Sequence, residues 1–468
     1  MFLKIKPGRF SKDPQGNHSL HHSIYDGMAY SIMMGAGETY FAAFALFLKV
    51  TAGQVGLLST LPPLLGSFAQ LISVLINRRI KVCKPIILSG VLTQAFLWLP
   101  LLWLVIYPAQ NSFAPLFILL SLYYGAAHLA APTWTRLIGD IVPERRRGRY
   151  FAQRNRLTSI MTLIALILAG VVLHYFDKGG YTWAGFAVLF IIAFIARLIS
   201  AWHIKQMHEP VVHATTLERP ATVVNTVVHG GAVRFTLYFV LMQMAVAIAS
   251  PFFAVYMLRD LHFNYIEFMA NTGTAVLIQF STLRLWGRTG DIFGHRVILV
   301  ITGLTIPFLP LLWTVTDNFW YLIGVQVLSG LAWGGFNLGC GNLLFDYVPA
   351  AQRVSYVAVH NVLVAAGVFL GGLIGIGLIN FLPERATWLG NQSVLTPLLN
   401  VFLVSFLLRL LISSLFLKRI RERRGHYRPR LRREYIFRMT RFSAFMGLMY
   451  DFVTESRTDK DKKENAGL

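Results

Sequence analysis

A single carboxylate stands inside the first long apolar stretch of the chain. Glu38 lies in SIMMGAGETY, residues 31–40, and the equivalent place in the second half of the sequence holds Ala249. An ionised carboxylate in the middle of a bilayer costs about 2.5–3.5 kcal/mol, so such a side chain faces a water-filled space or a partner. We therefore predict that Glu38 binds a proton or a cation. The alternative is a protonated side chain that is hydrogen-bonded within the packing.

Other polar and aromatic residues lie in apolar stretches that we expect to line the same space. His128, in YYGAAHLAAP, can relay protons or contact a substrate. A buried histidine that only packs is the alternative. The remaining candidates for substrate or proton binding are Gln243, Gln326, Trp333 and Asn337. Because polar side chains also join helices inside membranes, these four have that second interpretation.

The sequence indicates neither an enzyme nor a cofactor. It has no phosphate-binding loop, and its His, Cys, Asp and Glu residues show no spacing typical of a metal site. We therefore expect no metal site, no cofactor and no ATP hydrolysis.

The composition is typical of a membrane protein. Of the 468 residues, 55% are hydrophobic and 14% are charged, which is too apolar for a soluble chain of this size. A helix needs about 20 apolar residues to cross a bilayer. Twelve stretches qualify: residues 24–48, 54–76, 84–107, 113–134, 156–176, 183–204, 233–257, 264–286, 297–316, 319–345, 355–381 and 394–417. They are continuous and do not alternate, so they predict an all-α membrane protein of twelve spans and exclude a barrel.

The twelve stretches form two sets of six that repeat each other. GDIVPERRRGRYFAQRN at 139–155 corresponds to FDYVPAAQRVSYVAVHN at 345–361, and LPLLW occurs at both 99–103 and 309–313. Similar segments in the same order at nearly one spacing indicate a duplicated half. The sequence predicts an N-terminal half over 1–204, a cytoplasmic linker over 205–232, a C-terminal half over 233–417 and a basic cytoplasmic tail over 418–468.

The placement of basic residues predicts the orientation. The net charge is +22, and the arginines and lysines gather on the side of both termini, as at Arg78 and Arg79. The opposite turns hold little more than Lys49, Lys178, Arg259 and Arg385. Cytoplasmic loops carry such an excess of basic residues. We expect a multi-pass protein of the plasma (inner) membrane with both termini in the cytoplasm, and no nucleic-acid partner.

The basic tail has its own pattern. From Leu431 its apolar residues recur at helical spacing. This predicts an amphipathic helix whose arginines bind anionic headgroups of the inner leaflet. Docking to a partner protein is the alternative.

The loop between the eighth and ninth stretches, GRTGDIFGHR, resembles a loop signature of the major facilitator superfamily. Gly287, Asp291, Gly294 and Arg296 match the signature in register. Together with twelve spans in two halves, the resemblance covers nearly the whole chain. It implies that Asp291 and Arg296 fasten the cytoplasmic ends of the halves, with Asp291 near Arg154 at the start of the fifth span.

Further charged residues are candidates for gating at the cytoplasmic face. Asp26 lies near the entry of the first span, where it is either a gate or an interface residue. The repeated loops place Asp140 near Arg147, and Asp346 near Arg353, where each pair can form across its turn.

Taken together, these features predict a secondary transporter for a small, amphipathic organic solute. Two halves would rock about a site near the middle of the membrane, so that the site opens to one side at a time. We expect coupling to a proton gradient through Glu38 and a monomeric protein. Two alternatives are an uncoupled facilitator of the same fold and a membrane receptor or assembly factor that works through the basic tail.

Overall fold

The computed structural model describes residues 10–11, 13–79, 82–109, 111–143, 146–209, 231–347, 353–390 and 394–420. The amphipathic helix predicted after Leu431 and most of the predicted linker lie outside these residues. The description below refers to the described residues alone.

The first six spans are built from nine helical segments. They are α1 (Pro14–Ala36), η1 (Glu38–Tyr40) and α2 (Phe41–Phe47) for the first span, α3 (Ala52–Arg79) for the second, α4 (Lys84–Phe96) and α5 (Trp98–Ile106) for the third, then α6 (Phe113–Ile141), α7 (Arg147–Lys178) and α8 (Thr182–Gln206).

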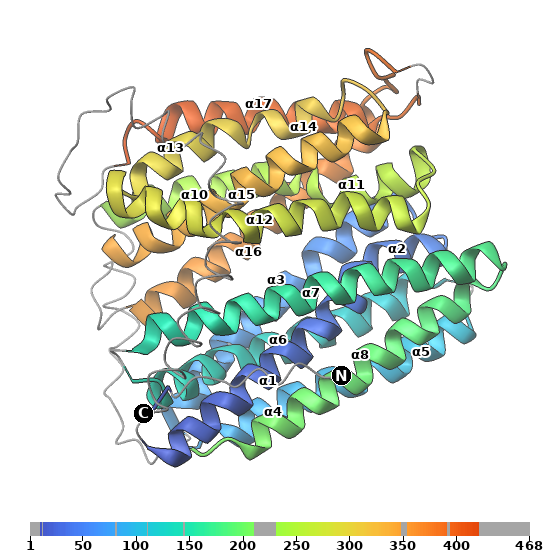
Figure 1. Ribbon diagram of the computed structural model, residues 1–468. Helices are drawn as coiled ribbons and strands as arrows, with labels where there is room; N and C mark the ends of the chain where they lie inside the picture. The colour runs from blue at the N-terminus through green and yellow to red at the C-terminus, as the bar shows by residue number, and fades with distance from the viewer. Residues whose placement is uncertain are drawn as a thin grey trace, which may run out of the picture.

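The last six spans repeat this pattern. They are α10 (Gly231–Ala247), α11 (Ser250–Val255) and η3 (Tyr256–Asp260) for the seventh span, α12 (Tyr265–Phe293) for the eighth, α13 (His295–Thr305) and α14 (Phe308–Leu312) for the ninth, then α15 (Phe319–Tyr347), α16 (Arg353–Phe381) and α17 (Leu398–Phe416). Every predicted stretch is helical, and Figure 1 shows the two sets as two layers, α1–α8 below and α10–α17 above. The prediction of twelve helices in two halves is confirmed.

Three spans are less apolar than the others. Nine helices of the described chain are long and apolar enough to cross a membrane, and α1, α3 and α12 are not among them. Two of these three lie where the halves meet, since α3 packs against α16 and α12 against α7. A helix with one face turned toward the other half needs less apolar surface than a helix that faces lipid all round.

Breaks in the helices are duplicated along with the sequence. The first span breaks at Gly37, between α1 and η1, and the seventh breaks at Ile248 and Ala249, between α10 and α11. The third span breaks at Leu97 and the ninth at Ile306. Breaks at membrane depth free backbone groups, which must be satisfied by protein or water. Such discontinuous helices are typical of substrate and ion sites in transporters.

The two halves pack closely at the end of the molecule that carries η1 and α11. Gly372 of α16 lies so near α3 that an added Cβ would stand 2.6 Å from Thr60 Cγ2, and one at Gly170 of α7 would stand 2.6 Å from Met269 Cβ of α12. Toward the opposite end, a Cβ at Gly139, Gly287 or Gly341 would meet nothing within 4 Å. Figure 1 shows α7 and α12 side by side near α11 and apart toward that opposite end.

The end of α8 is tied to the start of α4. The backbone amides of Cys83 and Lys84 donate to the Glu209 carboxylate. The Lys84 ammonium donates in turn to the carbonyls of Lys205 and Met207, at 2.8 and 2.7 Å. A carboxylate that accepts from a helix N-terminus offsets the unpaired amides and the positive end of the helix dipole there.

Candidate functional site

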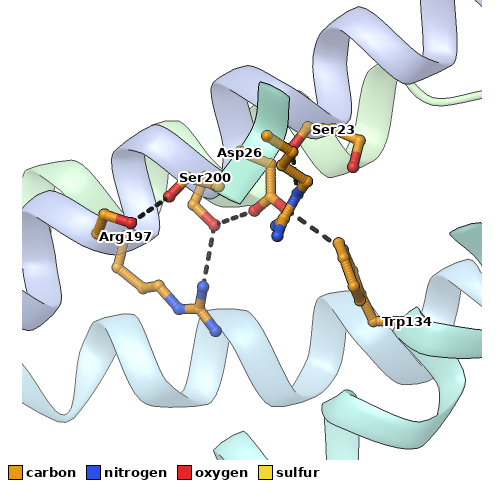
Figure 2. A network of polar contacts seen from close by, with 8 residues as sticks. Ser23, Asp26, Trp134, Arg197 and Ser200 are labelled. Atoms are coloured by element: carbon orange, nitrogen blue, oxygen red, sulfur yellow. Dashed lines mark hydrogen bonds and ion pairs between the residues drawn. The ribbon is translucent and has the colours of Figure 1, made fainter. Parts of the chain in front are cut away.

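The N-terminal half contains a buried polar network centred on Asp26. The carboxylate, in a residue only 3% exposed, accepts from the Ser200 hydroxyl at 2.7 Å and from the Trp134 indole N–H at 3.3 Å. Arg154 Nη2 lies 3.8 Å from the second carboxylate oxygen. Figure 2 shows Ser200 of α8 and Trp134 of α6 meeting Asp26 of α1, and Arg154 comes from α7. The network therefore joins four helices through one acid.

Two arginines share that acid. The Arg154 guanidinium lies over the Trp134 ring, 4.4 Å from its centroid, and its Nε donates to the Ser23 carbonyl. A Cβ at residue 27 would stand 2.8 Å from Arg154 Nη2, so glycine at this position lets the arginine rest against α1. Arg197 donates to the Ser200 hydroxyl at 3.0 Å. A buried acid with two cations satisfies the requirement that buried charges be paired.

Glu38 lies farther along the first span, in the short 3-10 turn η1 that follows the break at Gly37. Its residue is neither fully buried nor exposed. The Tyr123 hydroxyl donates to one carboxylate oxygen at 3.0 Å, and the Tyr124 hydroxyl lies beside the same carboxyl. A carboxyl with two phenolic partners can hold a proton or a cation.

Arg197 stands between the two acids. Its guanidinium covers the Tyr30 ring at 4.9 Å, and Tyr30 lies one turn beyond Asp26 on α1. The charge of Arg197 acts on both Asp26 and Glu38. The first span thus carries a line of polar groups, from the Asp26 network to the partly exposed Glu38.

Glycines beside Glu38 serve close packing. A Cβ at Gly35 would stand 2.5 Å from the Thr162 carbonyl of α7, and one at Gly37 would stand 2.4 Å from the Trp98 ring. These contacts bring α1 against α7 and the start of α5, and they fix the place at which the helix breaks.

The predicted binding residues of the C-terminal half lie in different surroundings. The Gln326 amide donates to the Asn271 carbonyl oxygen at 2.7 Å, a hydrogen bond between α15 and α12. Trp333 packs edge-on against Phe336, with ring centroids 5.5 Å apart, and Asn337, one turn along α15, is exposed. Gln243 of α10 is partly buried. None of the hydrogen bonds described here joins these four residues to Glu38.

His128 lies against the neighbouring helix of its own half. A Cβ at Gly66 of α3 would stand 2.8 Å from His128 Cδ2, so the imidazole covers the α3 backbone at that glycine. The residue is partly buried. The structure therefore brings Glu38 together with tyrosines of α6 and gives His128 a packing contact with α3.

The predicted gating residues divide into those with described side chains and those without. Asp26 is buried in the network above, Asp140 is exposed at the end of α6, and Arg296 is partly buried on α13. The side chains of Arg147, Asp291, Asp346 and Arg353 lie outside the described residues, so the pairs Asp140 with Arg147, Asp346 with Arg353 and Asp291 with Arg154 stay predictions. Within the described residues, Arg154 pairs with Asp26.

The C-terminal half has a counterpart of the network without an acid. Arg409 of α17 is 2% exposed and donates to the carbonyls of Ile306 and Val246, at 3.4 and 3.3 Å. At the place equivalent to Arg154 stands His360, whose Nδ1 lies 3.3 Å from the Thr236 hydroxyl. The Tyr356 hydroxyl contacts the same threonine and donates to the Ala232 carbonyl.

Sequence reasoning missed Arg197, Tyr123 and Trp134. One signal was present for the arginine, because Arg197 and Arg409 occupy the same place in the sixth and twelfth spans. A cation retained in both copies of an apolar helix indicates a buried role. The aromatic residues gave no signal, since tyrosine and tryptophan are common in membrane helices.

The fold and this site define a membrane transporter built from two six-helix repeats. The sequence pattern described as the Major Facilitator Superfamily matches residues 27–239 and again 235–454. The chain belongs to the Major Facilitator Superfamily, a family of transporters and not of enzymes.

Similar proteins carry the same fold or short matching segments. The vacuolar membrane amino acid uptake transporter fnx2 of Schizosaccharomyces pombe is 30% identical over 131 residues, 28% of this chain and 22% of that protein. The low-affinity glucose transporter HXT1 of Saccharomyces cerevisiae is 28% identical over 96 residues, 20% of this chain and 17% of that protein. These matches span about a fifth of the length of the two relatives.

Solved structures show the fold over most of the chain. The nucleoside transporter NupG is 12% identical with a TM-score of 0.60, over 86% of this chain and 98% of that one. A bacterial homologue of the iron transporter ferroportin, solved in an inward-facing state, is 15% identical with a TM-score of 0.63, over 86% and 98% of the two chains.

Proposed function

We propose that this protein is a secondary transporter in which Glu38 takes up and releases a coupling proton while the two halves alternate. The observation that carries the proposal is the placement of Glu38: a carboxyl at a helix break, bonded to Tyr123, in a partly exposed residue, with Ala249 at the equivalent break of the other half. The helix break occurs in both halves, but the acid occurs in one half only. We expect residues that only support the fold to occur in both halves, so an acid in one half is suited to proton transfer.

The cargo class that we propose is a small, amphipathic organic solute. The related proteins are named as transporters of amino acids, glucose and nucleosides. Two partly exposed tyrosines, Tyr30 and Tyr124, lie near Glu38 and give aromatic surface there, whereas Tyr123 is fully buried. Such surfaces suit a molecule with an apolar part and a few hydrogen-bonding groups.

We assign the end at which the two halves are apart to the cytoplasmic side of the plasma (inner) membrane. Arg78 and Arg79 belong to that end, while Lys49 and Lys178 belong to the closed end. Basic residues favour the cytoplasmic side. Binding of the basic tail to anionic lipid is part of the same proposal.

The proposal is tested in proteoliposomes loaded with a pH-sensitive dye. Radiolabelled amino acids, glucose and nucleosides are screened first, and the solute that is taken up is then used to drive proton movement. Glu38→Gln should abolish solute-driven proton movement and the pH dependence of uptake. Glu267→Gln is the matched control, because this residue closes a capping box at Asn264 that glutamine can also make.

Three outcomes contradict the proposal. Glu38→Gln with unchanged uptake and unchanged pH dependence removes the role of the carboxyl. Counterflow in the wild type without any proton movement favours the uncoupled facilitator. Loss of the cellular phenotype on deletion of residues 425–468, with no uptake of any solute by the intact chain, favours the receptor or assembly factor.

A further inference from the structure

A groove between α1 and α8 opens on the surface of the N-terminal half, away from Glu38. Its volume is about 360 Å³, which is in the range of small-ligand sites, about 300–1,000 Å³. Ala29 and Ala196, 5% and 4% exposed, form its floor. The larger side chains of Ile32, Ile195 and Ile199 stand along its sides. The result is an apolar slot between two helices.

One end of the groove is polar. His203, in its lining, has Nδ1 2.8 Å from Nδ1 of His22, and His22 Nε2 lies 3.2 Å from Nε2 of His18. We call these three residues the His chain. Tyr25 stacks on His203 with centroids 5.3 Å apart, and Trp202, 54% exposed, packs edge-on against His22. Exposed tyrosine and tryptophan mark the headgroup level of a membrane, so the His chain lies at that level.

The His chain can take one added proton. Each ring nitrogen of His22 faces another imidazole nitrogen, and each contact needs one N–H and one lone pair. A neutral chain therefore keeps one N–H at one end and one lone pair at the other. His22 precedes the apolar stretch that begins at residue 24. Burial lowers the pKa of His22 to about 4, and the neighbouring imidazoles of His18, His203 and His21 contribute to the shift.

The groups around the His chain suit an anion, because an imidazole can donate an N–H or take up a proton. The titratable groups that act on His22 from α1 and α8 are the imidazoles of His18, His21 and His203, and its ring neighbours are Tyr25 and Trp202. The nearby carboxylate of α1, Asp26, is engaged by Ser200, Trp134 and Arg154. An anion at the polar end of the groove would therefore contact imidazole donors, and the Asp26 carboxylate would not compete with it because that carboxylate already has partners.

We propose that the groove binds one anionic phospholipid, with an acyl chain between α1 and α8 and the headgroup phosphate at the His chain. The apolar slot suits a hydrocarbon chain, and imidazole N–H groups suit phosphate oxygens. The slot ends at the headgroup level, where a phosphate would stand. An anionic lipid is favoured over a zwitterionic one because a choline group would bring a second cation beside the histidines.

Lipid binding should strengthen as the pH falls. A phosphate beside the imidazoles stabilises their protonated form, so binding is accompanied by proton uptake. Proton uptake accompanies binding between the pKa of the free chain, about 4 at His22, and the higher pKa of the complex, so the complex should be more stable at pH 5.5 than at pH 7.5. This site is separate from the proposed transport function, and its test measures binding and not flux.

The test uses the full chain in detergent micelles and the unfolding midpoint as readout. Phosphatidylglycerol, phosphatidylcholine with the same acyl chains, and glycerol 3-phosphate are titrated at pH 5.5 and 7.5. A ligand that binds the folded state raises the midpoint by mass action. We expect phosphatidylglycerol to raise it most, more strongly at pH 5.5, and glycerol 3-phosphate to leave it unchanged.

Matched variants assign the effect to the groove. His203→Gln removes the headgroup contact and Ile195→Trp fills the slot, and each should raise the half-saturating phosphatidylglycerol concentration at least about tenfold, which corresponds to about 1.4 kcal/mol. His174→Gln and Ile164→Trp, both on α7, are the controls and should match the wild type. Should His203→Gln fail to fold, His18→Gln at the exposed end of the His chain replaces it.

Several results overturn the proposal. Equal stabilisation by both lipids at both pH values leaves no headgroup selection. Equal stabilisation by glycerol 3-phosphate makes this a site for free phosphate. Retention of the lipid effect in Ile195→Trp removes the groove from the site, and retention in both histidine variants removes the His chain.

Discussion

The two halves of the molecule hold an arginine at the same place and surround it differently. Arg197 of α8 and Arg409 of α17 stand 212 positions apart, and each is at most 6% exposed. Arg197 donates to Ser200, which donates to Asp26. The hydrogen bonds of Arg409 go to the backbone carbonyls of Val246 and Ile306. Both copies retain the cation, and among the described side chains an acid lies beside it in the first half alone.

This difference assigns a structural role to Arg409 and a role near the titrating acids to Arg197. Ile306 lies at the break of the ninth span and Val246 in the last turn of α10, just before the break of the seventh, so Arg409 satisfies backbone carbonyls near the places where helices are interrupted. Arg197 instead stands between two carboxyls, Asp26 and Glu38. We infer that the C-terminal half provides a rigid counterpart while the titrating groups are concentrated in the N-terminal half.

Removing the acid of the N-terminal network should have the largest effect. Asp26→Asn leaves Arg154 and Arg197 buried without their shared anion, and breaking a buried ion pair costs about 3–5 kcal/mol. Unfolding in detergent by heat or denaturant measures the loss. Asp177→Asn, at an exposed carboxylate that accepts from Thr182, should change stability by less than about 0.5 kcal/mol. Equal stability of the two variants would remove Asp26 from the centre of the network.

Placing an acid in the second half should not restore function. Ala249 is fully buried, and the places equivalent to Tyr123 and Tyr124 hold Leu328 and Ser329. Ala249→Glu is therefore expected to cost about 2.5–3.5 kcal/mol. In the background of Glu38→Gln it should not bring back proton-coupled uptake, as measured in proteoliposomes. Recovery of coupling would show that the halves are interchangeable.

The two arginines should respond differently to the same replacement. Arg409→Met leaves the carbonyls of Val246 and Ile306 without this donor, at a cost of about 1–3 kcal/mol in stability, while the folded protein should keep the pH dependence of its uptake. Arg197→Met should lose that pH dependence, although Asp26 keeps Trp134 and Arg154. Identical pH profiles for both variants would contradict the separation of roles.

The polar contact of the C-terminal half should have the smallest effect. Gln326→Leu removes the hydrogen bond to Asn271, and such bonds between membrane helices are worth about 0.6 kcal/mol on average. A double-mutant cycle with Asn271→Leu measures this coupling energy. A coupling energy near zero together with lost solute uptake would instead assign Gln326 to substrate binding.

The sequence predicted the spans well because each must supply about 20 apolar residues to cross the membrane. The sequence marks the helix breaks less clearly. Pro251 and Pro307 lie at breaks, but Pro132 lies inside the unbroken α6, and the first span breaks at a glycine. Proline is therefore not sufficient to end a helix whose neighbours satisfy the freed backbone groups.

The candidate site was predictable only in part. Glu38 was identifiable because a carboxylate within an apolar span costs free energy on insertion into the membrane, whichever way its side chain points. The partners of Asp26 were not, since α8 is apolar on most of its surface and its sequence does not reveal which side meets α1. Ser200 and Trp134 come to Asp26 from helices more than 100 positions away. Such contacts depend on how each helix is rotated about its axis.

The hydrogen bonds between Glu209 and the start of α4 suggest where the chain can be divided into two fragments. Cys83 and Lys84 donate to this carboxylate before the chain enters the segment that leads to α10. A break in the polypeptide after residue 209 would leave these hydrogen bonds intact. We therefore expect that the two fragments, each with six spans, can be produced from separate messages and assembled in one cell, so that either repeat can be labelled without the other.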